Sequence, residues 1–164
     1  AVKIPPMIFG GAQERNMRAG TENVYGIVGL AKALETGYEN LSATKQHISE
    51  VRDYMKSELE KNIPDISFSG DVDGRCLYTV LNASFPMTGK TQLLLFNLDI
   101  AGICASSGSA CSSGSDKSSH VLEAIHSDPN RVAIRFSFSK YNTKEEVDFV
   151  IAKLKELVMV PVTV

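Results

Sequence analysis

The chain has 164 residues, of which 43% are hydrophobic and 22% are charged, a composition typical of one ordinary globular domain. A chain of this length removes roughly 70% of its unfolded surface from water, so it needs neither disulfides nor a structural metal to form a core. Seventeen basic and nineteen acidic residues give a net charge of −2, which favours neither nucleic acid nor an anionic membrane as a partner. Because no apolar run is long enough for a membrane span and no signal-like leader opens the chain, we expect a cytoplasmic protein.

The cysteines Cys76, Cys104 and Cys111 are an odd set without Cys-x-x-Cys spacing. We therefore expect neither a disulfide framework nor a thiolate zinc site. The three histidines are too scattered along the sequence to form a metal site, and we predict no bound metal. Since the first residue is Ala and a Pro-Pro pair follows, we interpret the chain as a piece of a longer protein.

The first part of the chain predicts a loop followed by two helices. Residues 1–22 are rich in Gly and Pro and are expected to form an ordered loop. Helical spacing of apolar residues predicts one helix from Val24 and a second over residues 41–61, which Pro64 ends. The apolar stripe of the second helix consists of Ile48, Val51, Met55 and Leu59.

The middle of the chain predicts short elements. Residues 66–69 and 77–85 are β-branched or aromatic runs bounded by Gly-Asp turns, and we expect strands there. Residues 88–98 return to a helical pattern. A further strand is expected over residues 100–104, and one or two helical turns over residues 118–125.

The last part of the chain has the clearest pattern. Strict alternation of apolar and polar residues over 132–138 predicts a half-buried strand. Thr143 and Glu146 form a capping box, and helical spacing from Val147 to Val158 predicts a terminal helix. Helices and strands therefore mix without a strict βαβ rhythm. The predicted fold class is α+β or mixed α/β, with helices packed on one face of a small, mostly antiparallel sheet.

Residues 106–119 form a polar segment with eight serines and two glycines. This composition cannot bury enough apolar surface to pack, so we expect the segment to be mobile. One interpretation is a solvent-exposed linker with an incidental thiol. The other is that Cys111, at the centre of the segment, is a nucleophile that must reach and leave a reaction centre. Cys76 and Cys104 adjoin predicted apolar strands and are expected to be core residues.

Two other polar residues each allow a structural and a functional interpretation. Arg135 lies on the polar face of the predicted strand, as a surface arginine or as a rigidly mounted clamp for a carboxylate. Thr21 precedes the first helix, as its N-cap or as part of a phosphate site at the helix start. The sequence spacing does not decide between the two interpretations of Arg135, and it favours the N-cap interpretation for Thr21.

Three motifs occur in register along the chain. They are GGAQERNMRAGTENV at 10–24, SSGSAC at 106–111 and IRFS at 134–137. Together they resemble the C-terminal part of the NifS-like, class I cysteine desulfurases, which are pyridoxal-phosphate-dependent enzymes of the class V aminotransferase family. The resemblance covers nearly the whole chain.

The resemblance implies the aminotransferase-type fold of the pyridoxal-phosphate transferases. Residues 23–164 would form its small C-terminal domain, and residues 1–22 would lead in from a large cofactor domain that is missing. The cofactor lysine of the family belongs to a Ser-x-His-Lys motif, and no histidine of this chain is followed by Lys. We therefore expect pyridoxal phosphate to be held by a lysine outside this chain, and the fragment alone to be inactive.

The same resemblance implies roles for three residues. Cys111 would be the catalytic nucleophile that carries the persulfide, Arg135 would bind the carboxylate of the substrate, and Thr21 would contact the cofactor phosphate across a dimer interface. The implied enzyme converts L-cysteine to L-alanine and delivers sulfur to iron–sulfur cluster assembly, through an acceptor or scaffold protein. It would be a cytoplasmic homodimer that binds neither nucleic acid nor membrane.

Two alternatives stay open at this point. One is another lyase of the same family, such as a selenocysteine lyase or a cysteine-sulfinate-type enzyme. The other is a non-enzymatic sulfur-binding or interaction module that keeps the small-domain fold. Residues 157–164 lack the extension expected of the family, which leaves the contact with an acceptor protein undetermined.

Overall fold

The computed structural model describes residues 5–107 and 119–159. The chain divides into two compact units, Ala1–Leu41 and Ser42–Val164. The first unit contains the 3-10 helix η1 (Glu14–Asn16) and the helix α1 (Val24–Glu39). None of the residues of α1 is buried, and its apolar side chains are exposed to solvent. The helix predicted from Val24 is confirmed, but none of the described residues of the first unit is buried.

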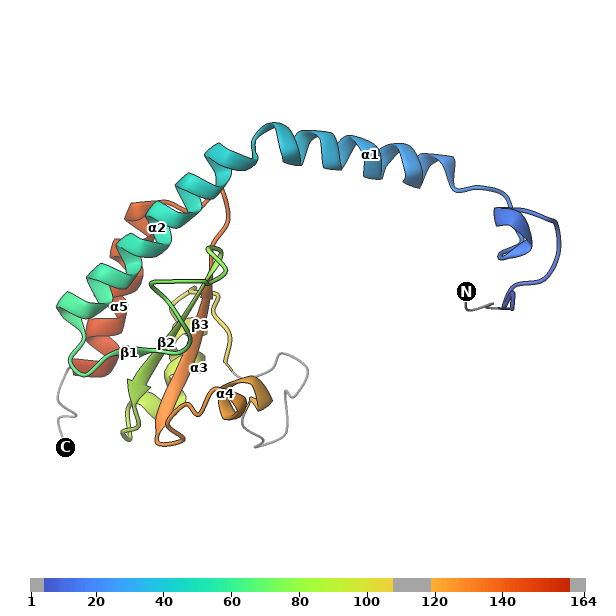
Figure 1. The fold of residues 1–164 in the computed structure, drawn as a ribbon. Helices are drawn as coiled ribbons and strands as arrows, with labels where there is room; N and C mark the ends of the chain where they lie inside the picture. The colour runs from blue at the N-terminus through green and yellow to red at the C-terminus, as the bar shows by residue number, and fades with distance from the viewer. Residues whose placement is uncertain (1–4, 108–118, 160–164) are drawn as a thin grey trace. The chain divides into compact units, whose positions relative to one another are not determined.

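The second unit packs helices against a three-stranded sheet (Figure 1). The strands lie in the order β1-β2-β3, and both pairings are antiparallel. Helices α2 and α5 lie side by side and are joined by a hydrogen bond of 2.7 Å from Tyr54 Oη to Asp148 Oδ1. The predicted class, helices on a small antiparallel sheet, is confirmed. The elements are α2 (Leu41–Asn62), β1 (Ser67–Phe68), β2 (Val80–Pro86), η2 (Thr91–Leu93), α3 (Leu94–Ile100), α4 (His120–Ala124), β3 (Arg131–Ser137) and α5 (Lys144–Met159).

One hydrophobic core joins the sheet to helices α2, α3 and α5. The inward side chains of β2 and β3 alternate with outward polar ones, as the period of a strand requires. Each fully buried Leu or Phe of this core contributes about 1.5–3 kcal/mol of transfer free energy. The centre of the core consists of Leu59, Leu81, Phe85, Leu94, Leu98, Ile134 and Leu154.

The strongest sequence patterns are confirmed. All four residues of the predicted α2 stripe are buried. The capping box is formed at the start of α5, where Thr143 N–H donates to Glu146 Oε2 at 3.1 Å and Glu146 N–H donates to Thr143 Oγ1 at 3.3 Å. The alternation on β3 buries Ile134 and Phe136. Within the described residues, no helix is both long and apolar enough to cross a membrane.

The strand expected over residues 100–104 is wrong. Ile100 ends α3, and the chain then turns through Gly102, whose φ of 78° is the left-handed conformation that favours glycine. Ile103 N–H donates to Leu98 O at 2.9 Å and Gly102 N–H to Asp99 O at 2.9 Å, the two bonds of a Schellman helix end. A short apolar run does not distinguish a helix end from a strand, and here tertiary packing decides.

Candidate functional site

Arg135 lies in a row of polar residues that crosses the sheet. On one side its register partner is Asn82 of β2. On the other side Ser106 pairs with it as an isolated antiparallel bridge, with Arg135 N–H donating to Ser106 O at 2.6 Å and Ser106 N–H donating to Arg135 O at 3.1 Å. Directly opposite residues of antiparallel strands project to the same face. The row therefore gathers three polar side chains on the face opposite to the buried Ile134 and Phe136.

The guanidinium of Arg135 is held at one nitrogen only. Its Nε–H donates to Ser106 Oγ at 3.0 Å. Within residues 5–107 and 119–159, no carboxylate forms an ion pair with Arg135, and neither Nη has a hydrogen-bond partner. The Oδ1 atom of Asn82 is buried without a partner. A rigid, half-buried arginine with two free Nη groups has the donor geometry that binds a carboxylate through two parallel hydrogen bonds.

Cys111 lies outside the described residues, so its predicted role as a nucleophile stays a prediction. Ser106 is the point at which the described part of the chain reaches the segment that carries Cys111. Ser106 and Cys111 are five positions apart in the sequence. The backbone bridge at Ser106 thus fixes the start of the Cys111 segment next to Arg135.

Thr21 lies in the first unit, at the start of α1, and it is not the cap of that helix. The cap is Asn23, whose Oδ1 accepts a hydrogen bond of 3.0 Å from Gly26 N–H. The Thr21-Glu22-Asn23 sequence offers two cap candidates, and Asn23 lies directly before the first helical residue. The exposed hydroxyl of Thr21 has no hydrogen bond to another described residue, and it is available to a ligand oxygen.

Arg18, near Thr21, is already engaged. Its Nη2 lies 3.1 Å from Glu22 Oε2 and 3.6 Å from Glu14 Oε1, and its Nη1 donates to Gly20 O at 2.8 Å. These contacts order the loop before α1 without using Thr21. The Thr21 hydroxyl therefore lies on a loop that the contacts of Arg18 stabilise.

Cys76 and Cys104 are exposed, so their expected place in the core is wrong. The strand expected over residues 77–85 begins only at Val80, and the strand expected over 100–104 is a helix end followed by a turn. Neither cysteine therefore occupies the inward position of a strand that its apolar neighbours suggested. Both thiols are accessible for comparison with Cys111 in labelling experiments.

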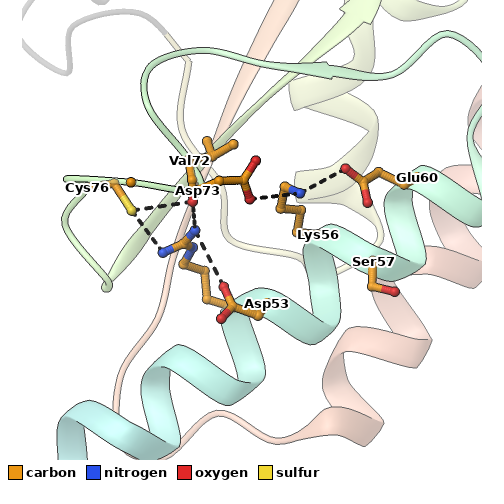
Figure 2. A pocket seen from close by; sticks show the side chains of 9 residues that line it. Asp53, Lys56, Ser57, Glu60, Val72, Asp73 and Cys76 are labelled. Carbon is orange, nitrogen blue, oxygen red and sulfur yellow. Dashed lines mark hydrogen bonds and ion pairs between the residues drawn. The ribbon is translucent and has the colours of Figure 1, made fainter.

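Cys76 lines a pocket of about 260 Å³ between α2 and the loop before β2 (Figure 2). Arg52 is 6% exposed, and its Nη1 donates to Cys76 Sγ at 3.0 Å while its Nη2 donates to Val72 O. Lys56 lies between Glu60 at 3.0 Å and Asp73 at 3.2 Å. These two carboxylates raise the pKa of Lys56, the Glu60 hydrogen bond most. Both Nη groups of Arg52 and the ammonium of Lys56 have partners in the protein, whereas the buried Nε of Arg52 has none.

The sequence model of the family described as Aminotransferase class-V matches residues 4–150 of this chain. The chain belongs to the class V aminotransferase family. It is 42% identical over 159 residues to the cysteine desulfurase IscS of Dictyoglomus turgidum, covering 95% of this chain and 40% of that protein. It is 43% identical over 166 residues to a cysteine desulfurase of Gluconacetobacter diazotrophicus, covering 95% of this chain and 41% of that protein.

Solved structures agree with this assignment to the class V family. A NifS-like protein from Rickettsia africae matches with a TM-score of 0.72 and 31% identity, covering 97% of this chain and 41% of that structure's chain. A second NifS-like protein matches with a TM-score of 0.73 and 36% identity, covering 93% of this chain and 38% of that one. The chain thus spans about two fifths of the length of these relatives.

The enzymes of this class V group use pyridoxal phosphate. The described residue that fits this group is Thr21, because a free hydroxyl at a helix start is a suitable partner for a phosphate oxygen. No His-Lys pair occurs in the sequence, so the family's cofactor lysine is not part of this chain. The residues present fit a peripheral phosphate contact and not the whole cofactor site.

Sequence reasoning found Arg135 but assigned no role to Ser106 or Asn82. The contact between Ser106 and Arg135 joins residues 29 positions apart, and no periodicity in the sequence reports such a pairing. The one available signal for Ser106 was its place at the boundary between an apolar run and the Ser/Gly segment. Thr21 and Arg135 belong to different units, and each is described here within its own.

Proposed function

We propose that this chain is the C-terminal part of a pyridoxal-phosphate-dependent cysteine desulfurase. The observation that carries the proposal is the Arg135 guanidinium, whose two Nη groups have no partner among the described residues and whose backbone pairs with Ser106 at the start of the Cys111 segment. A carboxylate clamp next to a thiol-bearing segment is what an enzyme acting on an amino-acid thiol needs. The names of the similar proteins support the same activity.

In this proposal Arg135 binds the carboxylate of L-cysteine through its two Nη groups and thereby orients the substrate thiol. The bound cofactor supplies an electron sink for the substrate. Cys111, as the thiolate, attacks the substrate sulfur. The substrate Cβ–S bond breaks, a bond forms between Cys111 Sγ and the departing sulfur, and the carbon takes up a proton to give L-alanine. No external oxidant or reductant is needed.

Thr21 contributes its hydroxyl to the cofactor phosphate. In the proposed enzyme this contact is made across the interface of a cytoplasmic homodimer. The persulfide on Cys111 is then passed to an acceptor or scaffold protein, with iron–sulfur cluster assembly as its destination. The persulfide transfer to the acceptor thiol is a sulfur exchange that returns Cys111 to its starting form.

The experiment that tests this proposal replaces the nucleophile in a complete desulfurase that contains this chain. Cys111→Ser is expected to abolish persulfide formation and sulfur transfer, while the melting temperature stays close to wild type because the substitution replaces one small polar side chain by another in a Ser/Gly-rich sequence. Mass spectrometry after incubation with L-cysteine is expected to place the extra sulfur on Cys111 in the wild type.

Cys104→Ser is the matched control, because Cys104 is an exposed thiol of the same chain. This variant is expected to keep full activity. Persulfide on Cys104, or full activity in Cys111→Ser, would overturn the proposed nucleophile. If the enzyme releases selenide from L-selenocysteine but transfers no sulfur from L-cysteine, a selenocysteine lyase would be favoured instead.

A further inference from the structure

We infer that Ser106 is a positioning residue for Arg135, which fixes how the arginine meets a carboxylate. This inference rests on the proposed function, because that function supplies the carboxylate ligand. Ser106 itself touches neither substrate nor cofactor in this account. Its role is to hold one edge of the guanidinium and so determine which edge is left for the ligand.

The backbone places the two side chains together before any ligand binds. The two hydrogen bonds of the Ser106–Arg135 bridge, at 2.6 and 3.1 Å, lock the two residues opposite each other. Opposite residues of an antiparallel pair project to the same face, so the Ser106 hydroxyl meets Arg135 Nε at 3.0 Å. The position of the hydroxyl is therefore set by the sheet and not by a flexible contact.

The chemistry of arginine then restricts the geometry of binding. A guanidinium can bind a carboxylate side-on, through Nε and one Nη, or end-on, through both Nη groups. The bond from Nε to Ser106 Oγ occupies the side-on edge. The end-on pair is what remains, and the held side chain loses less rotamer freedom when a ligand binds.

Asn82 is a second hydrogen-bond acceptor in the polar row that contains Arg135. Asn82 lies on the other side of Arg135, and its buried Oδ1 has no donor. It is an acceptor within the same polar row that does not hold the guanidinium in this structure. In a variant without the Ser106 hydroxyl, we expect the Arg135 guanidinium to be held less firmly, with Asn82 Oδ1 as an alternative acceptor across the sheet.

The test uses a complete desulfurase that contains this chain, with three variants. Ser106→Ala removes the hydroxyl and is expected to raise the KM for L-cysteine about tenfold, with kcat within about twofold of wild type, since one hydrogen bond to a charged group is lost. Ser106→Thr keeps the hydroxyl and is expected to stay within about threefold of the wild-type KM. Ser107→Ala is the matched control, an exposed neighbouring serine for which no change in KM is expected.

A second measurement reads the hydrogen bond directly in the chain as it stands. The NMR signal of the Arg135 Nε–H is expected to exchange with water about tenfold faster in Ser106→Ala than in wild type, and to remain protected in Ser106→Thr. A positioning role predicts that loss of protection and rise in KM occur together in the same variant.

The outcomes separate the two claims. An active wild-type enzyme whose KM does not change in Ser106→Ala overturns the inference and leaves the proposed function standing. A parallel fall of kcat and melting temperature that Ser106→Thr does not restore also overturns it, because a merely structural serine behaves in that way. A wild-type enzyme without desulfurase activity overturns the proposed function and, with it, the ligand of the clamp.

Discussion

Strand β3 carries two arginines whose surroundings differ, Arg131 at its start and Arg135 further along. Arg131 and Arg135 are four residues apart, so both project from the same face of the strand. Each gives its Nε–H to a serine hydroxyl, Ser84 at 3.2 Å and Ser106 at 3.0 Å respectively. They differ at the Nη groups, which have protein partners in Arg131 and have none among the described residues in Arg135.

The Nη groups of Arg131 tie β3 to two other parts of the fold. Nη1 lies 3.2 Å from Asp65 Oδ2, and Nη2 donates to Ser84 O at 2.6 Å and to Asp65 O. This arginine therefore closes the turn between α2 and β1 against the sheet. The position on the strand therefore does not distinguish a structural arginine from a binding one. The partners of the Nη groups distinguish the two.

The largest effect on stability is expected at Arg131. Arg131→Ala removes the ion pair with Asp65 and the donors to Asp65 O and Ser84 O, and we expect the free energy of unfolding to fall by about 2–3 kcal/mol. Urea denaturation followed by circular dichroism measures this loss. Arg135→Ala is the matched control on the same strand, and its unfolding free energy is expected to stay within about 1 kcal/mol of wild type. Equal losses in the two variants would contradict the comparison.

A smaller effect on stability is expected for two threonines, of which one has hydrogen-bond partners in the protein and the other has none among the described residues. Thr143 completes the capping box of α5, whereas the Thr21 hydroxyl has no partner among the described residues. Thr143→Ala is expected to reduce the unfolding free energy by about 1 kcal/mol. Thr21→Ala is expected to change it by less than about 0.5 kcal/mol and to weaken binding of pyridoxal phosphate by the complete enzyme. Urea denaturation measures the two changes in stability, and a cofactor titration measures the affinity for pyridoxal phosphate. An unchanged cofactor affinity in Thr21→Ala would show that Thr21 is not part of the cofactor site.

The smallest effect concerns a hydrogen bond between helices whose contribution to stability is lost only at high pH. The hydrogen bond to Asp148, with the charge of that carboxylate, raises the pKa of Tyr54 to about 12. A pKa raised in the folded state favours the protonated phenol there, so its contribution to stability is complete below about pH 10 and disappears as the pH rises toward 12.

Ultraviolet absorbance of the phenolate measures this titration. One tyrosine is expected to ionise near pH 12, and the Tyr54→Phe variant is expected to lack that step. Asp148→Asn is expected to move the step toward the ordinary tyrosine pKa, because the carboxylate charge is gone. A titration curve that is the same in wild type and Tyr54→Phe would show that the contact between α2 and α5 is not formed in solution.

The sequence predicted most of what depends on one-sided burial. The stripe on α2 and the alternation on β3 are direct records of which side chains face the core, because burial imposes the period of the element on the sequence. The capping box of α5 was equally readable, since its two partners are three residues apart. Local contacts leave a local pattern.

What the sequence did not predict depends on contacts between distant residues. The end of α3 looked like a strand over 100–104, because five apolar and small residues fit either element. Cys76 and Cys104 were expected in the core and are exposed, because the lengths of the neighbouring elements decide which residue faces inward. The sequence does not decide between a surface and a binding role for Arg135, because the Ser106 bridge and the lack of Nη partners among the described residues are tertiary features.

The most direct test of the open Arg135 clamp is the KM for L-cysteine of a complete desulfurase that contains this chain, measured in wild type, Arg135→Ala and Arg135→Lys. We expect Arg135→Ala to raise the KM about a hundredfold, since a two-bond, charge-assisted contact with the carboxylate is lost. We expect Arg135→Lys to remain close to Arg135→Ala, because an ammonium group cannot reproduce the end-on pair of hydrogen bonds. A KM that is unchanged in Arg135→Ala, or fully restored in Arg135→Lys, would contradict the account.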